Sequence, residues 1–297
     1  MRTCILLLLA AMAGHAAGQT TFKVRTELVR IDVLVERDGR PVADLAATDF
    51  IVEDNGVAQK VDLLPAAESV SVSTVLDVSG SMTPAKLENA AAGVRAVMAA
   101  LRERDRHALY AFAGDVRRLA VAAPHDAPSA GSLARALRQA SGPRTSLCDA
   151  LFATILQGYV EAGPKLLIVL TDGRNNTSWL SARSVVDAAI RHETVIYPVA
   201  IGADSSTHPF DVPPMLGNDA LRLLQVLAER TGGRVIHADW SRDLGPVFGS
   251  LIREYRQRYI LSFVPEGVAR GDGWHRLAVT LRNRAGKVHA RSGYWSR

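Results

Sequence analysis

The sequence predicts an α/β protein with a doubly wound, mainly parallel sheet and antiparallel β segments on both sides of it. Two observations support this fold class. From Val70 onward, short apolar runs alternate with amphipathic stretches of helical period, which is typical of a sheet covered by helices on both faces. Before residue 70 and after residue 258, apolar and polar residues instead alternate between turn signals, as in antiparallel strands.

The composition excludes several classes of protein. With 297 residues, of which 48% are hydrophobic and 22% charged, the chain can bury one large core or two modest ones, so disordered and fibrous proteins are not expected. The formal net charge of +5 comes from arginines scattered along the chain. Because no nucleic-acid-binding motif accompanies them, we expect no nucleic-acid partner.

Residues 1–18 are predicted to be a secretory signal peptide. Arg2 precedes an apolar run over residues 5–12, small residues follow, and cleavage is expected near Gln19. That run is too short to span a bilayer, and no later stretch reaches about 18 continuous apolar residues. We therefore expect an exported protein, periplasmic or extracellular, with no transmembrane segment after signal cleavage.

The mature chain would keep a single thiol. Only Cys4 and Cys148 are present, and Cys4 would leave with the signal peptide, so no internal disulfide is expected. Cys148 lies in an apolar stretch of helical period, which favours a buried thiol without a chemical role.

Residues 19–69 are predicted to form an N-terminal β segment. Apolar and polar residues alternate over residues 28–35. The dipeptides Asp38-Gly39 and Asn55-Gly56 are hairpin turn signals, so the strands of this segment should be antiparallel.

Residues 70–258 are predicted to form the doubly wound domain. The continuous apolar run at residues 166–170 is typical of a central strand that helices cover on both faces. The expected strands cover residues 70–76, 107–113, 165–170, 195–201 and 234–237. The expected helices cover residues 84–102, 132–140, 146–161, 181–192, 220–230 and 243–256.

Residues 259–297 are predicted to form a C-terminal β segment. Strand patterns return at residues 259–264, 274–281 and 287–295. Because neither β segment is large enough for a core of its own, we expect both to pack together as one sandwich-like module with the α/β domain inserted between them. Two separate extensions are the alternative.

Oxygen-bearing side chains follow the expected strands at the points where those strands end. Asp77, Ser79 and Ser81 come directly after the first strand, Thr145 precedes the third helix, and Asp172 follows the third strand. The carboxyl ends of parallel strands share one edge of a sheet, so these side chains are expected to meet there. Their carboxylate and hydroxyl oxygens suit a partly hydrated Mg²⁺ with an open coordination position. The alternative is that the aspartates cap helices and the serines form a turn.

The same residues carry a resemblance to a known family. The D-x-S-x-S sequence at Asp77, Ser79 and Ser81, the threonine loop at Thr145 and the T-D-G sequence at Asp172 resemble the metal-ion-dependent adhesion site of von Willebrand factor type A (VWFA) domains. The resemblance implies that Ser79, Ser81 and Thr145 coordinate the ion directly. Asp77 and Asp172 would act mostly through water or by orienting the hydroxyls. The implied ion is Mg²⁺, with Mn²⁺ and Ca²⁺ as alternatives.

The resemblance covers about residues 70–258, and the flanks are similar to those of bacterial VWFA-related exported proteins. The chain departs from the family pattern at Pro143-Arg144, where paired glycines are common. A cation at Arg144 would lower the metal affinity or select an anionic ligand.

The predicted function is a metal-dependent protein-binding module for adhesion or complex assembly, in which a partner's Asp or Glu completes the coordination of the ion. No enzyme is predicted, because Ser79 has no G-x-S-x-G surroundings and no H-E-x-x-H sequence occurs, so no catalytic residue is named. A structural scaffold with a vestigial or purely stabilising metal site is the main alternative, and a metal-dependent hydrolase is the weaker one. The partner's identity and the oligomeric state stay open.

Three further features have simpler interpretations. Residues 203–218 should emerge on the metal edge, where they would either shape partner specificity or form a plain surface loop. The Arg270-Gly271-Asp272 sequence is expected to be a hairpin turn. The tryptophans at positions 240, 274 and 295 are expected to serve packing.

Overall fold

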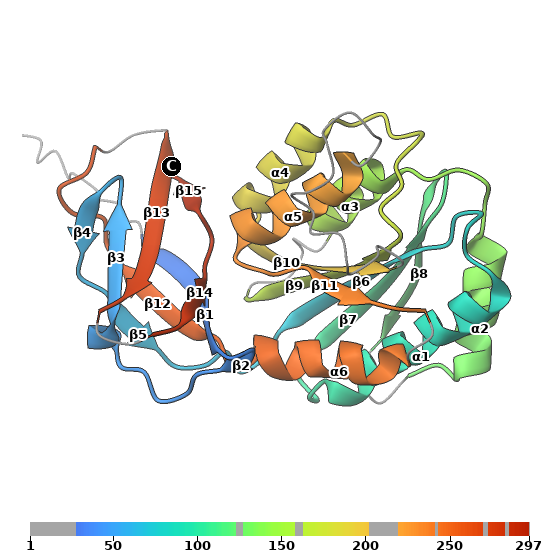
Figure 1. Cartoon of the computed structure of the whole chain (residues 1–297), viewed down its shortest axis with the longest axis horizontal. Coiled ribbons are helices and arrows are strands. Elements are labelled where there is room, and N and C mark those ends of the chain that lie inside the picture. The colour runs from blue at the N-terminus through green and yellow to red at the C-terminus, as the bar shows by residue number, and fades with distance from the viewer. Residues whose placement is uncertain are drawn as a thin grey trace, which may run out of the picture.

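The computed structural model describes residues 28–122, 127–157, 163–201, 219–240, 243–269, 273–282 and 285–296. Our predictions for the signal peptide, for residues 203–218 and for the tripeptide at residues 270–272 fall outside these ranges. Figure 1 shows the described chain as an α/β body on one side and a smaller all-β body on the other.

The α/β body is built on a six-stranded sheet with the strand order β11-β10-β9-β6-β7-β8. All neighbouring strands are parallel except β7 and β8, which pair antiparallel at the sheet edge. The doubly wound, mainly parallel fold class is therefore confirmed. The strands are β6 (Ser71–Asp77), β7 (Arg106–Phe112), β8 (Val116–Ala122), β9 (Lys165–Thr171), β10 (Thr194–Ile201) and β11 (Ile236–Ala238).

Strand β8 was not among the predicted strands. It lies at the edge of the sheet, where Arg117 and Arg118 are exposed. Charged side chains are common on edge strands because they oppose unwanted pairing, and here they interrupt the apolar pattern that marks the inner strands. The sequence signal was therefore too weak for prediction.

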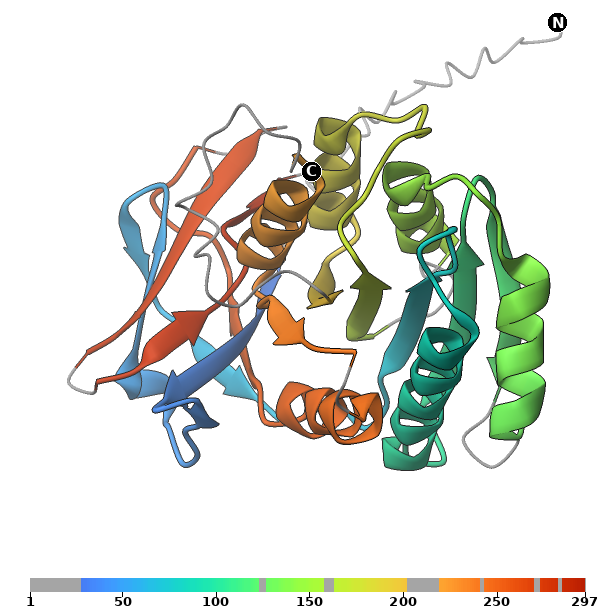
Figure 2. The ribbon, with the colours of Figure 1, turned by 45° about the vertical axis from the view of Figure 1, so that its right-hand side comes forward.

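Six helices in the described ranges cover the two faces of this sheet (Figure 2). α1, α2 and α6 pack on one face, and α3, α4 and α5 pack on the other. The helices are α1 (Pro84–Ala100), α2 (Ala130–Ala140), α3 (Leu147–Gln157), α4 (Ala182–Arg191), α5 (Asp219–Thr231) and α6 (Leu244–Tyr255).

Strand β9 shows how the core is divided between the two faces. Leu166, Ile168 and Leu170 belong to the core under α1, α2 and α6, whereas Leu167 and Val169 belong to the opposite core. All five side chains are buried, and each such burial contributes about 1.5–3 kcal/mol. The continuous apolar pattern of this strand follows from burial on both sides.

The all-β body contains strands from both ends of the chain. β1 pairs antiparallel with β12 and β14, and β3 pairs antiparallel with β13. One apolar core joins Ile31 and Phe50 with Leu261 and Phe263. The strands are β1 (Val29–Arg37), β2 (Arg40–Pro41), β3 (Phe50–Asp54), β4 (Val57–Gln59), β5 (Asp62–Leu64), β12 (Tyr259–Phe263), β13 (Trp274–Leu281), β14 (Lys287–His289) and β15 (Gly293–Trp295), with a short 3-10 turn η1 at Ala47–Asp49. The domain boundaries at residues 18, 69 and 258 stay predictions.

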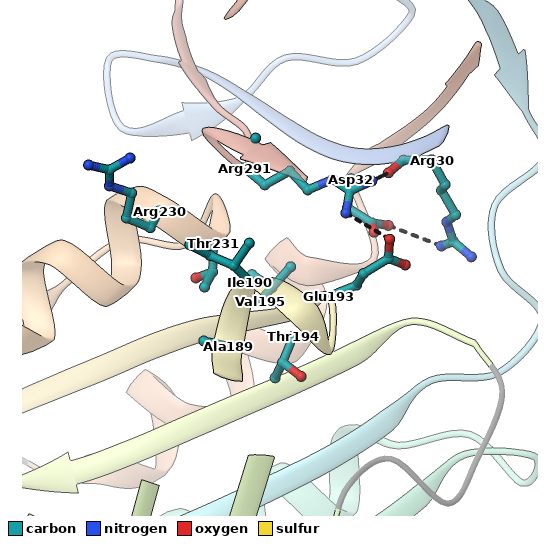
Figure 3. A pocket seen from close by; sticks show the side chains of 11 residues that line it. Arg30, Asp32, Ala189, Ile190, Glu193, Thr194, Val195, Arg230, Thr231 and Arg291 are labelled. Atoms are coloured by element: carbon teal, nitrogen blue, oxygen red, sulfur yellow. Dashed lines mark hydrogen bonds and ion pairs between the residues drawn. The ribbon is translucent and has the colours of Figure 1, made fainter. Parts of the chain in front are cut away.

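The β body contacts the α/β body at the amino ends of β10 and β11. Arg258, which is buried between α6 and β12, donates hydrogen bonds to the hydroxyl of Tyr197 in β10 (2.9 Å) and to the main-chain oxygen of Asp32 in β1 (3.2 Å). Figure 3 shows a small pocket at this junction, lined by side chains from both bodies. Its volume of about 20 Å³ holds about one water molecule. The metal-site prediction concerns the opposite edge of the sheet.

Candidate metal centre

Asp77 ends strand β6 with its side chain fully buried. Its Oδ1 accepts a hydrogen bond from the backbone N–H of Ser79 (2.9 Å), and its Oδ2 accepts one from the hydroxyl of Thr171 in β9 (2.8 Å). The backbone N–H of Val78 donates to the main-chain oxygen of Phe112 in β7 (2.9 Å). Three adjacent strands therefore fix the position and orientation of this carboxylate.

The two serines of the D-x-S-x-S sequence lie close to Asp172. The Oγ atoms of Ser79 and Ser81 are 3.4 Å apart, and the Ser81 hydroxyl donates to Oδ2 of Asp172 (2.7 Å). Asp172 directly follows β9, which pairs with β6 in parallel register. Four of the five predicted ligands are thus joined by hydrogen bonds at the carboxyl edge of the sheet.

The fifth predicted ligand, Thr145, lies in a loop that contacts the serine loop. The backbone N–H of Gly142 donates to the main-chain oxygen of Val78 (3.3 Å), and a Cβ atom at Gly80 would lie 3.7 Å from the Cα of Pro143. The Thr145 side chain is buried. Within the described residues, no hydrogen bond links its hydroxyl to the other four predicted ligands.

The charges of this edge are unbalanced. Burial raises the pKa of Asp77, hydrogen bonds from Ser79 and Thr171 oppose this rise, and the negative charge of Asp172 adds to it. Two acids therefore share one small region, and a cation bound there would relieve both the desolvation and the repulsion.

The donor set fits a hard divalent cation. No group of three or more His, Cys, Asp and Glu side chains within the described ranges is placed to hold a metal ion. The candidate centre instead combines hydroxyl oxygens with two carboxylates. Mg²⁺, Mn²⁺ and Ca²⁺ prefer oxygen donors of this kind, whereas a soft metal ion prefers sulfur.

A loop that sequence reasoning missed holds the start of helix α3. The Oδ1 atom of Asn176 accepts a hydrogen bond from the backbone N–H of Thr145 (2.9 Å). The Oδ1 atom of Asn175 accepts one from the backbone N–H of Leu147 (3.1 Å). The Ser178 hydroxyl oxygen accepts the N–H of Cys148 (3.0 Å). Side-chain oxygens from residues 175–178 thus satisfy backbone donors that the first turn of a helix leaves unpaired. The run of Asn, Thr and Ser after the T-D-G sequence was the available signal.

Two cations lie beside the site. The Nε atom of Arg174 is 3.5 Å from Oδ2 of Asp172, and Nζ of Lys86 donates to the main-chain oxygen of Ser81 (3.0 Å). Arg144, the cation that the sequence analysis considered, packs its stem on the loop after β7, because a Cβ atom at Gly114 would lie 3.3 Å from its Cβ. Sequence reasoning therefore missed Arg174, which is the arginine that contacts a predicted ligand.

A doubly wound sheet with polar side chains gathered at its carboxyl edge defines the class of α/β ligand-binding domains. A family model of the von Willebrand factor type A domain matches residues 72–243. The chain therefore belongs to the von Willebrand factor type A family, whose members often mediate metal-dependent protein interactions and are typically not enzymes.

Solved structures with a similar fold come from several sources. Proximal thread matrix protein 1 from the mussel byssus is 16% identical over 67% of this chain and 49% of that chain, with a TM-score of 0.49, so the present chain spans about half of its length. BatB from Bacteroides thetaiotaomicron is 20% identical over 62% of this chain and 96% of that chain, with a TM-score of 0.44. A von Willebrand factor type A protein from Catenulispora acidiphila is 14% identical over 92% of this chain and 74% of that chain, with a TM-score of 0.48. No curated protein matches the sequence significantly.

Among the helices in the described ranges, none is both long enough and apolar enough to cross a bilayer.

Proposed function

We propose that the protein is an exported protein-binding module, in which a divalent cation held by Asp77, Ser79, Ser81, Thr145 and Asp172 receives a carboxylate from a protein partner. Mg²⁺ is the proposed ion, with Mn²⁺ and Ca²⁺ as alternatives. The observation that supports it most strongly is the convergence of the two aspartates and two serines at the carboxyl edge, with hydrogen bonds of 2.7–2.9 Å that orient them.

Each residue of the proposed site has a role that follows from its contacts. Asp77 is held by Thr171 and by the backbone of Ser79, so it acts by orienting the neighbouring hydroxyls and by adding negative charge. The Oγ atoms of Ser79 and Ser81, 3.4 Å apart, are the hydroxyl oxygens that would coordinate the ion. The cation, when bound, supplies an electrophilic centre with a coordination position left for a ligand oxygen.

The acid count favours an anionic partner. Two carboxylates neutralise a divalent cation, and Arg174 adds a positive charge beside Asp172. A partner's Asp or Glu would bring a hard oxygen and a negative charge to this region, which suits both the ion and the arginine. Export rests on the predicted signal peptide at residues 1–18.

Calorimetric titration with Mg²⁺ and Mn²⁺ tests the proposal. Wild type should bind the ion, and Ser79→Ala and Asp77→Ala should lose binding. Ser73→Ala is a matched control, because Ser73 lies earlier in the same strand and is half-buried. Ion at about 100 times its Kd should stabilise wild type by about 2.7 kcal/mol. Equal binding, or none, in all four proteins would overturn the metal site.

The partner is tested by a pull-down from the native cell envelope with and without chelator. A partner captured only in the presence of the ion would support the proposal. Recovery that is indifferent to chelator would instead favour a structural scaffold.

A further inference from the structure

Trp179 is a tryptophan that the fold leaves in solvent. Its side chain is 96% exposed, far more than the other large apolar residues at the described surface. Its backbone is nevertheless held in place, because its N–H donates to both carboxylate oxygens of Asp149 (3.1 and 3.0 Å). The N–H of Leu180 donates to the same carboxylate (2.9 Å). Tryptophan is enriched among the residues that dominate the affinity of protein interfaces, and here its backbone is already positioned.

The position of Trp179 connects it with the proposed metal site. It lies in the loop between β9 and α4, which begins with Asp172 and runs beyond the carboxyl edge of the sheet (Figure 2). Asp149, which holds its backbone, lies in the first turn of α3, the helix that follows the Thr145 loop. Trp179 therefore stands on the rim of the same edge.

Two exposed arginines flank Trp179 in the sequence. The side chains of Arg174 and Arg183 are 72% and 92% exposed, and Arg183 lies in the first turn of α4. Arg183 pairs with the half-exposed Asp187 (3.9 Å), whereas Asp172, the acid beside Arg174, is only 17% exposed. The charge that faces solvent at Arg174 is therefore positive, and an acidic ligand complements it.

We propose that Trp179 and Arg174 form a docking surface for an acidic protein segment, in which one carboxylate binds Arg174 and an apolar side chain packs on Trp179. The proposal rests on the proposed function, because another carboxylate of the same segment occupies the metal site. Arg174 provides steering and specificity, since exposed ion pairs add little affinity. Trp179 provides most of the binding affinity that does not come from the metal ion.

A membrane surface is the other class of partner that tryptophan and arginine suit. The fold favours protein, because Trp179 is the one strongly exposed large apolar side chain of its loop among the described residues, whereas peripheral membrane binding needs a broad apolar face or several inserted residues. Binding to vesicles is therefore an outcome that would overturn the proposal.

The test uses short Gly-Ser peptides that carry one Asp, two Asp, or two Asp and one Leu, with the purified protein in Mg²⁺. Wild type should prefer the second peptide to the first and the third to both. Arg174→Gln should lose the preference for the second Asp, about threefold. Trp179→Ala should lose the preference for Leu, about tenfold. Trp179→Phe should keep most of the preference for Leu.

Arg104→Gln is the matched control. Arg104 is 74% exposed and pairs with one exposed carboxylate, Glu68, but it lies just before β7 at the opposite edge of the sheet. The Arg104→Gln variant should bind all three peptides as wild type does. Mn²⁺ titration of every variant checks that the metal site is intact.

The results separate this inference from the proposed function. Wild type without peptide preference, or Trp179→Ala and Arg174→Gln with unchanged preferences, would overturn the docking surface while metal binding stands. Trp179-dependent binding to vesicles of phosphatidylethanolamine and phosphatidylglycerol would overturn it in favour of a membrane. Absent metal binding, or peptide binding that ignores chelator, would overturn the proposed function itself.

Discussion

The two edges of the central sheet bury charged groups in opposite ways. At the amino edge, Arg234 makes a two-point contact with Glu254 (3.1 and 2.6 Å) and also lies 3.5 Å from Glu36. His289 lies 2.7 Å from the same Glu36. At the carboxyl edge, Asp77 is held by hydroxyl and amide donors with a second acid nearby.

This difference separates a closed structural junction from a site that can accept a ligand. Buried acids at the amino edge have cationic partners from the chain itself, so the network joins the β body to α6 without an external ion. The buried acid at the carboxyl edge is compensated only by hydrogen bonds, and a bound cation would supply the missing charge. The four predictions below test this contrast.

The largest effect is expected when the amino edge loses a charge. Arg258→Met removes a buried guanidinium that bonds Tyr197, Gly232 and Asp32, and leaves their oxygens without that donor. The free energy of unfolding, measured with urea, should fall by about 3–5 kcal/mol, because each buried oxygen left without a donor costs about 1–3 kcal/mol.

Arg104→Met is the control for that experiment. The Arg104 side chain is 74% exposed and pairs with an exposed glutamate, so its loss should cost about 1 kcal/mol or less. Similar losses in both variants would contradict the view that the junction depends on a buried guanidinium whose hydrogen bonds are made within the chain.

The next effect concerns His107, which lies near the amino end of β7. Its Nε2 is 3.0 Å from the hydroxyl of Thr74, and burial lowers its pKa from 6.5 to about 4. Between pH 6.5 and 4 this histidine is protonated in the unfolded chain but neutral in the folded chain. Its contribution to stability is therefore fully present above about pH 6.5 and is lost as the pH falls towards 4. The free energy of unfolding should decrease by up to about 3 kcal/mol in that window.

Replacement isolates this contribution. His107→Gln can keep a hydrogen bond to Thr74 and should remove that part of the pH dependence in urea titrations. His237→Gln, at an exposed position, should keep the wild-type profile. An unchanged profile in His107→Gln would assign the acid loss to other groups, such as His289, whose pKa burial also lowers.

The inner part of the fold was predictable because its signals are local. The apolar runs of β6, β9 and β10 specify strands buried on both faces, and the order of the chain then places Asp77 and Asp172 on one edge. The burial of Cys148 was predicted correctly for the same reason. Edge strand β8 gave no such pattern, since one side of it faces solvent.

The surroundings of the site depend on contacts between segments distant in sequence. The contact of Arg174 with Asp172 and the bonds from residues 175–178 to α3 depend on how a loop folds back over a helix. Sequence reasoning considered Arg144 because it is adjacent to Thr145, and it considered three tryptophans for packing. Trp179 is exposed on a backbone that Asp149 holds across 30 residues of sequence, a contact that no periodicity reveals.

A smaller effect is expected at Asp77 itself. Burial raises its pKa, so in the absence of an ion the ionised carboxylate destabilises the fold as the pH rises above the ordinary carboxyl range. In chelator at neutral pH, Asp77→Asn should raise the free energy of unfolding by about 1 kcal/mol, or about 2–4 °C in Tm. The gain should shrink on acidification, because the wild-type carboxylate then becomes protonated. In Mg²⁺ the order should reverse, because the ion stabilises only the wild type.

Asp115→Asn is the control for this prediction. Asp115 is exposed and pairs with Arg117, so its replacement should bring no gain. If Asp77→Asn were less stable than wild type in chelator, the carboxylate would serve the fold, and the contrast between the two edges would fail.

The smallest effect, and the one that links the site to its rim, is expected at Arg174. Its guanidinium lies 3.5 Å from the Asp172 carboxylate and opposes a second cation there, but its side chain is 72% exposed, so solvent screens the repulsion. Arg174→Gln should therefore raise Mg²⁺ affinity by about two- to fivefold at low ionic strength, with the gain lost in high salt. Calorimetry would detect this gain, with Arg104→Gln as the unchanged control.

Arg174→Gln should also bind a doubly acidic peptide less selectively, because the arginine that opposes the ion also attracts the partner. Opposite signs for ion and peptide would place Arg174 at the boundary of the two, whereas a fall in both would make it a structural support of the loop.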